Sequence, residues 1–277
     1  MVEFKSFENG FKYVEISNAS SSAKIALQGA HIFEYKCGNK EEILWLSETS
    51  AFEYGTAIRG GVPVCWPAFG MNNPSLPQHG FSRTAMFEFI SSCEVNKRKT
   101  EVLLRLTHTP KSLKLWNYKF SLDFKVTISD TLVMELQTTN RDTKEFTLTQ
   151  ALHSYFRVSD ISNALVKGLK SKPRFDALTN KTFTQKYDIS FKEEFDSVFQ
   201  EVTNEIVLED KSRRVSIKNE GSTSVVVWNP WIEKGARMSG MRAEAYKEFV
   251  CIETANACED FRVLKANESH TLKATLC

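Results

Sequence analysis

Apolar and polar residues alternate along much of this chain. Residues 120–128 are apolar at every even-numbered position, from Phe120 to Ile128, and polar at the positions between them. A period of two is typical of an antiparallel strand that buries one face and exposes the other to water. Similar runs predict further strands at 24–28, 101–107, 132–138, 146–156, 205–208, 215–218, 225–228, 249–253 and 270–276.

Helical patterns are sparse in comparison. One short helix is predicted at 110–116, where a proline occupies the first turn, and a second at 243–249. No linker rich in proline, glycine or serine interrupts the succession of strands. We therefore predict an all-β fold, a single large antiparallel domain over 1–277 with two packed sheets and few short helices. Two smaller β domains that meet near residue 140 are the alternative.

Charge and composition narrow the range of partners. The 277 residues carry a net charge of +2, which does not favour nucleic acid or a membrane surface. No segment approaches the roughly 18 apolar residues of a membrane span, and the first residues lack an apolar stretch of signal-peptide length. The six cysteines form no C-x-x-C pair, so nothing signals zinc or thioredoxin-type chemistry. We expect a cytoplasmic protein without nucleic-acid or membrane partners, and a monomer.

Two stretches depart from the strand pattern. Residues 57–80 carry four of the seven prolines and four of the 12 glycines, and a loop of this length in a compact domain is usually functional. In residues 228–235, Trp228 and Trp231 bracket a turn at the end of an apolar strand. Whether these two tryptophans and Trp66 line a cleft or belong to the core is open at this level.

One histidine, His153, lies inside the predicted strand 146–156. Alternation along that strand puts His153 and Tyr155 on the more polar face. Such a histidine can give or take a proton near neutral pH. The other interpretation is a structural histidine that a hydrogen bond holds in the core.

Two acidic residues stand in apolar surroundings. Glu253 follows the apolar run 249–252, where burial would raise the pKa of its carboxyl and suit it to act as a base near neutral pH. A strand end that has reached solvent is the alternative. Asp196 lies between apolar neighbours in residues 195–199, where it either binds sugar hydroxyls or caps a turn.

The loop 57–80 and the residues that follow it supply candidate anion-binding groups. Arg59 precedes Gly60 and Gly61, whose bare backbone would let a ligand approach closely. Arg83 follows a short glycine-containing segment, and a guanidinium offers a rigid fork of donors to phosphate or carboxylate oxygens. Two surface arginines are the competing interpretation, and His79 in the same loop is either exposed or part of a site.

Five segments, taken in order, resemble a known family. They are 58–67 (IRGGVPVCWP), 76–83 (LPQHGFSR), 151–156 (ALHSYF), 227–231 (VWNPW) and 250–255 (VCIETA). Together they are similar to the glucose-6-phosphate 1-epimerases, or hexose-6-phosphate mutarotases, of the aldose 1-epimerase (galactose mutarotase-like) superfamily. The resemblance implies a β-supersandwich and an isomerase without metal or organic cofactor. It would interconvert the anomers of a hexose 6-phosphate, with glucose 6-phosphate as the expected substrate.

The resemblance also assigns roles to individual residues. It implies that His153 is the acid and that Glu253 is the base. It also implies that the phosphate or the rest of the substrate is bound by Arg59, Gln78 and Arg83. His79 would lie near the sugar, and Asp196 would bind hydroxyls. The pair Thr254-Ala255 stands where some relatives have Pro-Gly, and family members vary at the position of Gln78.

Two other functions compete with this one. A mutarotase for free aldoses would not need two arginines, so Arg59 and Arg83 disfavour it. A non-catalytic sugar-phosphate-binding protein on the same fold would not need a proton-transferring pair, so His153 and Glu253 disfavour that alternative. Binding of single-stranded nucleic acid is disfavoured by the near-zero net charge.

Overall fold

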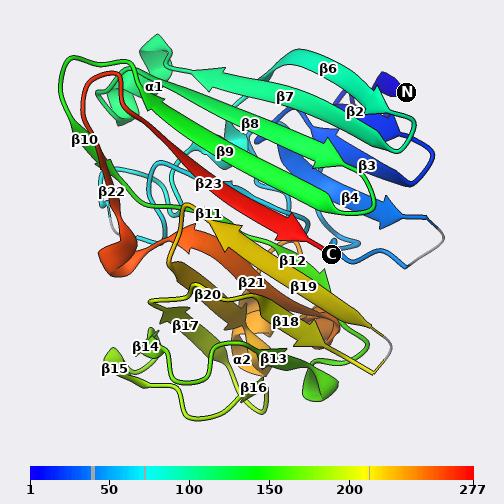
Figure 1. Ribbon diagram of the computed structural model, residues 1–277, viewed down its shortest axis with the longest axis vertical. Coiled ribbons are helices and arrows are strands. Elements are labelled where there is room, and N and C mark those ends of the chain that lie inside the picture. Colours follow the sequence, from blue (N-terminus) through cyan, green and yellow to red (C-terminus); the bar gives the residue numbers. More distant parts are fainter. Residues whose placement is uncertain (39–40, 72, 212) are drawn as a thin grey trace.

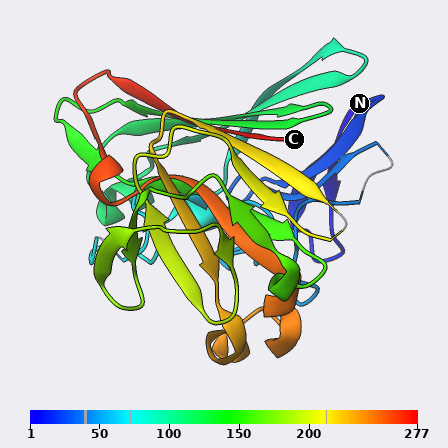
Figure 2. The same ribbon diagram turned by 60° about the horizontal axis from the view of Figure 1, so that its bottom comes forward.

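Two large antiparallel sheets, stacked as layers, dominate the computed structural model, which describes residues 1–38, 41–71, 73–211 and 213–277 (Figure 1, Figure 2). The first sheet has nine strands. In order across the sheet they are β16 (Ile189–Ser190), β13 (Leu165–Lys167), β18 (Ile206–Glu209), β19 (Arg214–Glu220), β23 (Ser269–Leu276), β9 (Leu132–Asn140), β8 (Phe120–Ile128), β7 (Lys99–Thr107) and β6 (Glu88–Asn96).

The second sheet has eight strands and carries the candidate site. In order they are β15 (Lys181–Thr184), β14 (Pro173–Asp176), β17 (Phe195–Phe199), β20 (Ser224–Asn229), β21 (Phe249–Asn256), β11 (Gln150–Leu152) and β5 (Val64–Cys65), and β12 (Tyr155–Arg157) pairs with a second part of β21. The antiparallel all-β prediction is therefore confirmed.

Smaller elements complete the fold. A four-stranded sheet contains β1 (Val2–Ser6), β2 (Lys12–Ser17), β3 (Ser21–Ala26) and β4 (His31–Cys37), and a two-stranded sheet contains β10 (Phe146–Leu148) and β22 (Arg262–Leu264). The helices are α1 (Pro110–Leu115), α2 (Trp231–Arg237) and the short 3-10 helices η1 (Ser82–Thr84), η2 (Ile161–Asn163), η3 (Ala243–Glu248) and η4 (Cys258–Asp260).

The main core lies between the two large sheets. The even-numbered residues of β8 are fully buried there, as the alternating pattern predicts, and they share one cluster with Val225 and Val227 of β20 and with Val250 and Ile252 of β21. Burial of each such side chain stabilises the fold by about 1.5–3 kcal/mol. Alternation then directs the remaining residues of the eight-stranded sheet to its other face.

That other face of β21 is unusual, because it is buried as well. Phe249 and Cys251 pack there against aromatic residues of a second, smaller cluster, and Glu253 follows them on the same face. A strand that is buried on both faces has an unbroken apolar sequence, and this explains the apolar run 249–252. The carboxylate of Glu253 therefore lies in a covered space and not at a solvated strand end, with 1% of its surface exposed.

The predicted strand 146–156 is wrong as a single element. It forms three short strands, β10, β11 and β12, with breaks at Thr149 and at His153 and Ser154. The segment 57–80, predicted to be a loop, contains the short strand β5, and at the breaks the backbone bonds to residues that flank β5, since the amide of Thr149 donates to the Pro67 carbonyl and that of His153 to the Pro63 carbonyl. Period-two reasoning along the whole run was therefore unsound, although His153 and Tyr155 do face the same space.

The helix predictions have mixed outcomes. The first is confirmed as α1, where Thr109 and Ser112 exchange side-chain to backbone hydrogen bonds at the N-terminus. The second is wrong in type, because 243–248 forms the 3-10 helix η3 and Phe249 already belongs to β21. Helix α2 follows Trp228 where only a turn was predicted.

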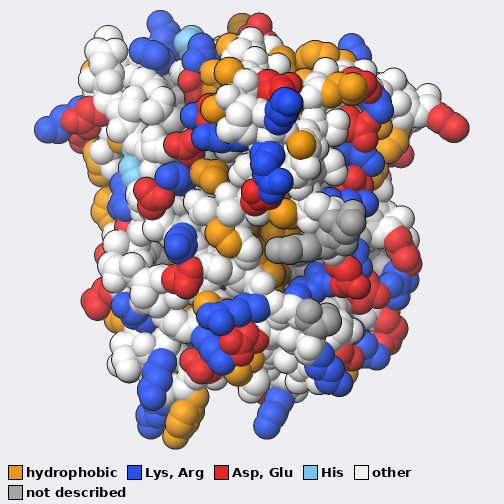
Figure 3. Space-filling view, turned by 45° about the vertical axis from the view of Figure 1, so that its right-hand side comes forward, with side chains coloured by type: hydrophobic (Ala, Val, Ile, Leu, Met, Phe, Trp, Pro, Cys, Tyr) orange, Lys and Arg blue, Asp and Glu red, His pale blue; other side chains and the backbone are white. Residues whose placement is uncertain are grey.

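The exposed surface carries mixed charge. On the face that Figure 3 shows, basic and acidic side chains are interspersed, in keeping with the small net charge. In the part of the chain that the structure describes, no helix combines the length and apolar character needed to span a membrane.

Candidate active site

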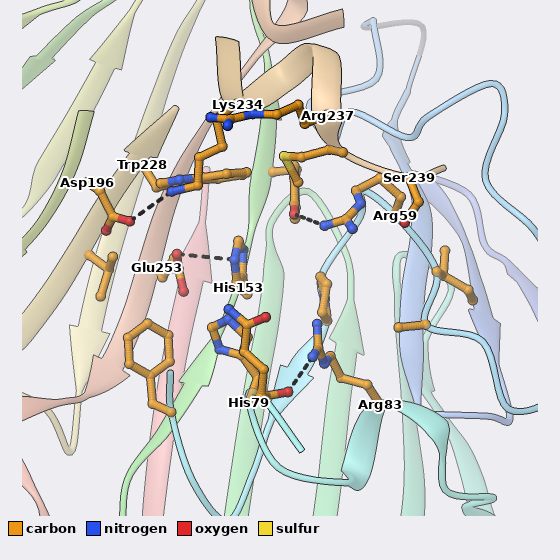
Figure 4. A pocket seen from close by; sticks show the side chains of 18 residues that line it. Arg59, His79, Arg83, His153, Asp196, Trp228, Lys234, Arg237, Ser239 and Glu253 are labelled. Atoms are coloured by element: carbon orange, nitrogen blue, oxygen red, sulfur yellow. Dashed lines mark hydrogen bonds and ion pairs between the residues drawn. The ribbon is translucent and has the colours of Figure 1, made fainter. Parts of the chain in front are cut away.

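A cavity of about 490 Å³ opens on the outer face of the eight-stranded sheet (Figure 4). It brings together all seven residues singled out from the sequence: Arg59, Gln78, His79, Arg83, His153, Asp196 and Glu253. They come from positions up to nearly two hundred residues apart. The fold is therefore what joins them into one candidate site.

Strand register places His153 directly opposite Glu253. Leu152 pairs with Thr254 in β11–β21, and Tyr155 pairs with Cys251 in β12–β21, so the same register continues across the break between β11 and β12. The Nε2 atom of His153 lies 3.4 Å from Oε1 of Glu253. Two groups that can each hold a proton are thus fixed side by side on adjacent strand segments.

Both members of this pair are buried, which favours their uncharged forms. Burial raises the pKa of Glu253 well above its usual value, with a further contribution from the charge of Asp196. Burial lowers the pKa of His153 well below its usual value, and His79, Arg83 and Arg59 lower it further. Because burial opposes the charged form of each group, the pair favours the state in which a single proton is held on Glu253 and His153 is neutral, which suits an acid–base pair.

The buried pair retains unused hydrogen-bonding capacity. Within the described residues, Nδ1 of His153 and Oε2 of Glu253 are buried and have no hydrogen-bond partner. Buried polar atoms without partners are rare in proteins, and a catalytic role is one of the reasons for which they occur.

His79 is held in one tautomer at the edge of this pair. Its Nδ1 accepts a hydrogen bond from the Gly70 amide at 3.3 Å, so the neutral ring carries its proton on Nε2. Burial lowers the pKa of His79 to about 3, with further contributions from Arg83 and Arg59. The ring lies 5.7 Å from that of His153, and it is a neutral hydrogen-bond donor to the cavity.

Two arginines reach the cavity from the loops. Arg83, in η1, donates through Nη2 to the Gln78 carbonyl at 2.6 Å, and Arg59 donates through Nη1 to the Tyr155 hydroxyl at 3.4 Å. Among the residues that the structure describes, neither guanidinium forms an ion pair with a carboxylate, and Nε of Arg59 is buried without a partner. Both arginines therefore keep donors and charge available for an anion.

The glycines after Arg59 serve packing and not ligand access, contrary to the expectation from the sequence. A side chain at Gly60 would come within 2.5 Å of the Trp45 carbonyl, and one at Gly61 within 2.3 Å of the Ile32 carbonyl. Both residues also adopt positive φ. They let the loop pass close to neighbouring backbone, which fixes the position of Arg59.

Asp196 lies at the opposite end of the cavity from the loop arginines (Figure 4). Burial raises the pKa of its carboxyl, and Lys234 partly opposes this shift. The Nζ atom of Lys234 lies 3.5 Å from Oδ2 of Asp196 and 2.8 Å from Oε1 of Glu194. The Asp196 oxygens are thus positioned beside a cation and open to the cavity, as a hydroxyl-binding group would be.

The sequence reasoning missed the contribution of α2. This helix and the residues after it supply Lys234, Arg237, Met238 and Ser239 to the cavity. The signal was present, because Lys234 and Arg237 are three residues apart and share one face of a helix. It was overlooked because 228–235 was read as a turn.

The structure shows which of the three tryptophans line the cavity and which belong to the core. Trp228 lines the cavity beside Lys234. Trp66 is fully buried in the main core, where its indole nitrogen donates to Thr138. Trp231 packs at the edge of that core against Tyr246.

The described residues contain no group of three or more His, Cys, Asp or Glu side chains placed to hold a metal ion. The polar groups of the cavity include the pair His153 and Glu253, a neutral histidine, a further acid, several cations, and the uncharged side chains of Gln78, Tyr155 and Ser239. This set can bind an anionic, hydroxyl-rich molecule and transfer protons.

Comparison with known proteins identifies the family of this chain. The profile of the aldose 1-epimerase family matches residues 12–277. An Escherichia coli K12 protein provisionally named glucose-6-phosphate 1-epimerase is 33% identical over 93% of this chain and 87% of its own length. A Cenchrus ciliaris protein with the same provisional name is 35% identical over 89% and 78%, respectively.

Solved structures give the same result. The crystal structure of a Salmonella typhimurium protein, provisionally described as a mutarotase, superimposes with a TM-score of 0.92 at 30% identity, over 100% of this chain and 92% of that one. Sequence and fold thus agree over nearly the whole chain, and the protein belongs to the aldose 1-epimerase family.

Proposed function

We propose that this protein is a hexose-6-phosphate mutarotase that interconverts the α and β anomers of glucose 6-phosphate. One observation carries the proposal: the cavity combines a buried proton-holding pair, His153 and Glu253, with Arg59 and Arg83, which form no ion pair with a carboxylate in the described chain. The pair suits ring opening, and the arginines suit a phosphate. The names of the relatives point to the same substrate.

The proton inventory of the pair matches the reaction. Ring opening needs a proton delivered to the ring oxygen O5 and another removed from the hydroxyl on C1. Burial favours the proton on Glu253 in the resting pair, and the active arrangement has it on His153 with Glu253 as carboxylate. His153 then protonates O5 while Glu253 accepts the C1 hydroxyl proton, the C1–O5 bond breaks, and rotation about C1–C2 precedes closure with both transfers reversed.

The layout of the cavity supports one orientation of the sugar. With O5 at His153 and O1 at Glu253, carbon C6 extends away from Glu253, because it is attached next to O5. Arg59 and Arg83 lie on that side of His153 in Figure 4, where they would bind the phosphate. Asp196 lies on the side of Glu253 and would accept hydrogen bonds from the hydroxyls next to C1. His79 would donate through Nε2, and Gln78 would contribute at the rim.

Phosphate binding also has a catalytic consequence in this scheme. A phosphate dianion between Arg59 and Arg83 offsets two of the positive charges that lower the pKa of His153. Binding of the phosphorylated sugar therefore favours the protonated acid. Binding energy from a part of the substrate that does not react is in this way used at the reacting bond.

Exchange spectroscopy by NMR tests the proposal directly. The rate of anomer exchange is measured for glucose 6-phosphate and for free glucose, with the wild-type protein and with His153→Gln. We expect catalysed exchange that favours the phosphorylated sugar and is lost in the variant. Equal catalysis of both sugars would contradict phosphate recognition, and undiminished exchange in the variant would contradict the acid–base mechanism.

We further propose a single-domain, monomeric, cytoplasmic enzyme without nucleic-acid or membrane partners. Support comes from the six cysteines, all of which are free thiols, and from the interspersed surface charge (Figure 3).

A further inference from the structure

Tyr155 is in contact with both functional parts of the cavity. Its ring stacks on the imidazole of His153, with centroids 4.9 Å apart and 11° between the planes. Behind it, Trp45 stacks at 5.8 Å and Phe249 packs at 5.1 Å. The tyrosine ring is therefore fixed on one side by the core and forms the surface against which His153 rests.

The hydroxyl of Tyr155 extends to the anion-binding side. It accepts the hydrogen bond from Nη1 of Arg59, and burial raises the pKa of this phenol, which keeps it neutral. Because Nη1 is engaged in this way, the other guanidinium donors of Arg59 that line the cavity are left for an anion. The hydroxyl thus sets the direction of the guanidinium.

Few other groups hold the acid in place. In the described chain, Nδ1 of His153 has no hydrogen-bond partner, and Nε2 lies 3.4 Å from Oε1 of Glu253 without a hydrogen bond between them. A metal-free catalytic histidine is usually oriented by a hydrogen bond on its second nitrogen. Here the parallel stacking on Tyr155 restricts the ring, together with edge contacts to Trp228 and His79.

We propose that Tyr155 is a positioning residue that couples phosphate binding at Arg59 to the orientation of the acid His153. Its ring orients the imidazole and its hydroxyl orients the guanidinium, so one rigid side chain sets the spacing between the phosphate and O5. This inference rests on the proposed function, because it assigns the anion at Arg59 to the substrate. The two contributions of Tyr155 are separable by substitution.

The kinetics of two variants test whether the ring and the hydroxyl of Tyr155 make separate contributions. Tyr155→Phe keeps the ring and removes the hydroxyl. We expect the preference for glucose 6-phosphate over glucose, as the ratio of kcat/KM values, to fall about 3- to 10-fold, mainly through KM, as loss of one weak charge-assisted hydrogen bond predicts. Tyr155→Leu removes both contributions, and we expect kcat to fall on the order of 10- to 100-fold on both sugars, because misplaced groups react slowly.

Tyr35→Phe is the matched control. Tyr35 is also buried and donates its hydroxyl proton to the Ser129 carbonyl, away from the cavity. We expect this variant to keep wild-type kinetics. If Tyr155→Phe keeps the wild-type preference within twofold, or if it lowers kcat on both sugars as strongly as Tyr155→Leu, the positioning role is refuted. Because Tyr155→Phe preserves the packing, this result does not depend on the leucine variant folding.

A binding measurement separates this inference from the proposed function. Inorganic phosphate is titrated into the protein while the imidazole signals are followed by NMR, with the His153 signal identified from His153→Gln. We expect phosphate to shift the His153 signal in the wild type, and Tyr155→Phe to weaken phosphate binding about 3- to 10-fold and reduce the shift. Phosphate binding that leaves the His153 signal unmoved would overturn the coupling. If the wild type showed this coupling but no catalysed exchange, the proposed function alone would fail.

Discussion

The floor and the rim of the cavity are built in different ways. We use floor for the residues on or between strands of the eight-stranded sheet: His153, Tyr155, Asp196, Trp228 and Glu253. We use rim for the residues on loops, η1 and α2: Arg59, Gln78, His79, Arg83, Lys234 and Arg237. The floor supplies the proposed proton-transferring pair, and the rim supplies most of the positive charge. Reaction and recognition are thus assigned to different kinds of structure.

The floor gains its precision from strand register. One row across the sheet runs through Asp196, Trp228, Cys251 and Tyr155, which are successive cross-strand partners. The next row runs through Val198, Val226 and Glu253 to His153. Backbone hydrogen bonds on both sides of β20 and β21 hold these rows in place, so the backbone positions that carry His153 and Glu253 stay opposite one another.

The rim depends on side chains that are longer and more exposed. Gln78 and Arg237 are exposed, and Arg59 and Arg83 are half-buried. Loops tolerate change better than a paired sheet does, and they commonly determine which ligand a rigid scaffold accepts. The comparison therefore predicts that floor substitutions change kcat, whereas rim substitutions mainly change KM and the preference for phosphate.

Glu253→Gln should have the largest effect. The amide keeps the shape of the side chain and removes the base, so we expect kcat for anomer exchange to fall by about 10²–10⁴-fold, the usual contribution of a positioned acid–base group. Exchange spectroscopy gives the rate, and the melting temperature reports whether the fold persists. A folded variant that retains more than a tenth of the wild-type kcat would remove Glu253 from the mechanism.

Arg59→Ala and Arg83→Ala should have the next largest effect, and it should appear in a different parameter. Each removes charge-assisted hydrogen bonds to the phosphate, so we expect KM for glucose 6-phosphate to rise about 10- to 100-fold. The preference over free glucose should fall by a similar factor. A large fall in kcat with an unchanged KM would mean that these arginines act on the reaction as the floor residues do. It would contradict the division of roles between floor and rim.

The pH dependence of kcat/KM tests the two titrating groups of the floor, His153 and Glu253. The active form of the pair holds one proton, so activity falls at low pH when His153 and Glu253 are both protonated and at high pH when both are deprotonated. Since burial lowers the pKa of His153 and raises that of Glu253, we expect kcat/KM to stay level across neutral pH.

Asp196→Asn should move one side of that profile. The charge of Asp196 raises the pKa of Glu253, so its removal lowers that pKa, and the alkaline limb should shift to lower pH. The position of the limb is compared, and not its height, because the substitution also weakens hydroxyl binding. An alkaline limb that stays in place or moves to higher pH would mean that Glu253 does not control it.

Arg237→Ala should have the smallest effect. Arg237 is exposed on α2, and exposed charges contribute little because solvent screens them, so we expect KM for glucose 6-phosphate to rise only about two- to fivefold. Arg214→Ala, an exposed arginine on β19, is the control for the loss of one positive charge. If both variants behave alike, Arg237 contributes general charge and not a specific contact.

The sequence determined the class of fold and the chemical inventory. Alternation along 120–128 defined β8 to the residue, because that strand packs an apolar face on the core while its polar face is half-buried or buried. Edge and surface strands such as β6 and β15 escaped detection, since nearly all of their residues are exposed and no apolar face marks them. The single-domain organisation stays a prediction.

Only the tertiary structure decided how the chemical groups meet. No pattern in the sequence says that β11 and β12 pair with β21 in a register that sets His153 opposite Glu253, because strand pairing depends on contacts between distant segments. The roles of Gly60 and Gly61 likewise became clear only from the backbone that passes beside them. A single sequence specifies local periodicity and residue chemistry, whereas register, burial on both faces of β21 and the position of α2 arise from packing of the whole chain.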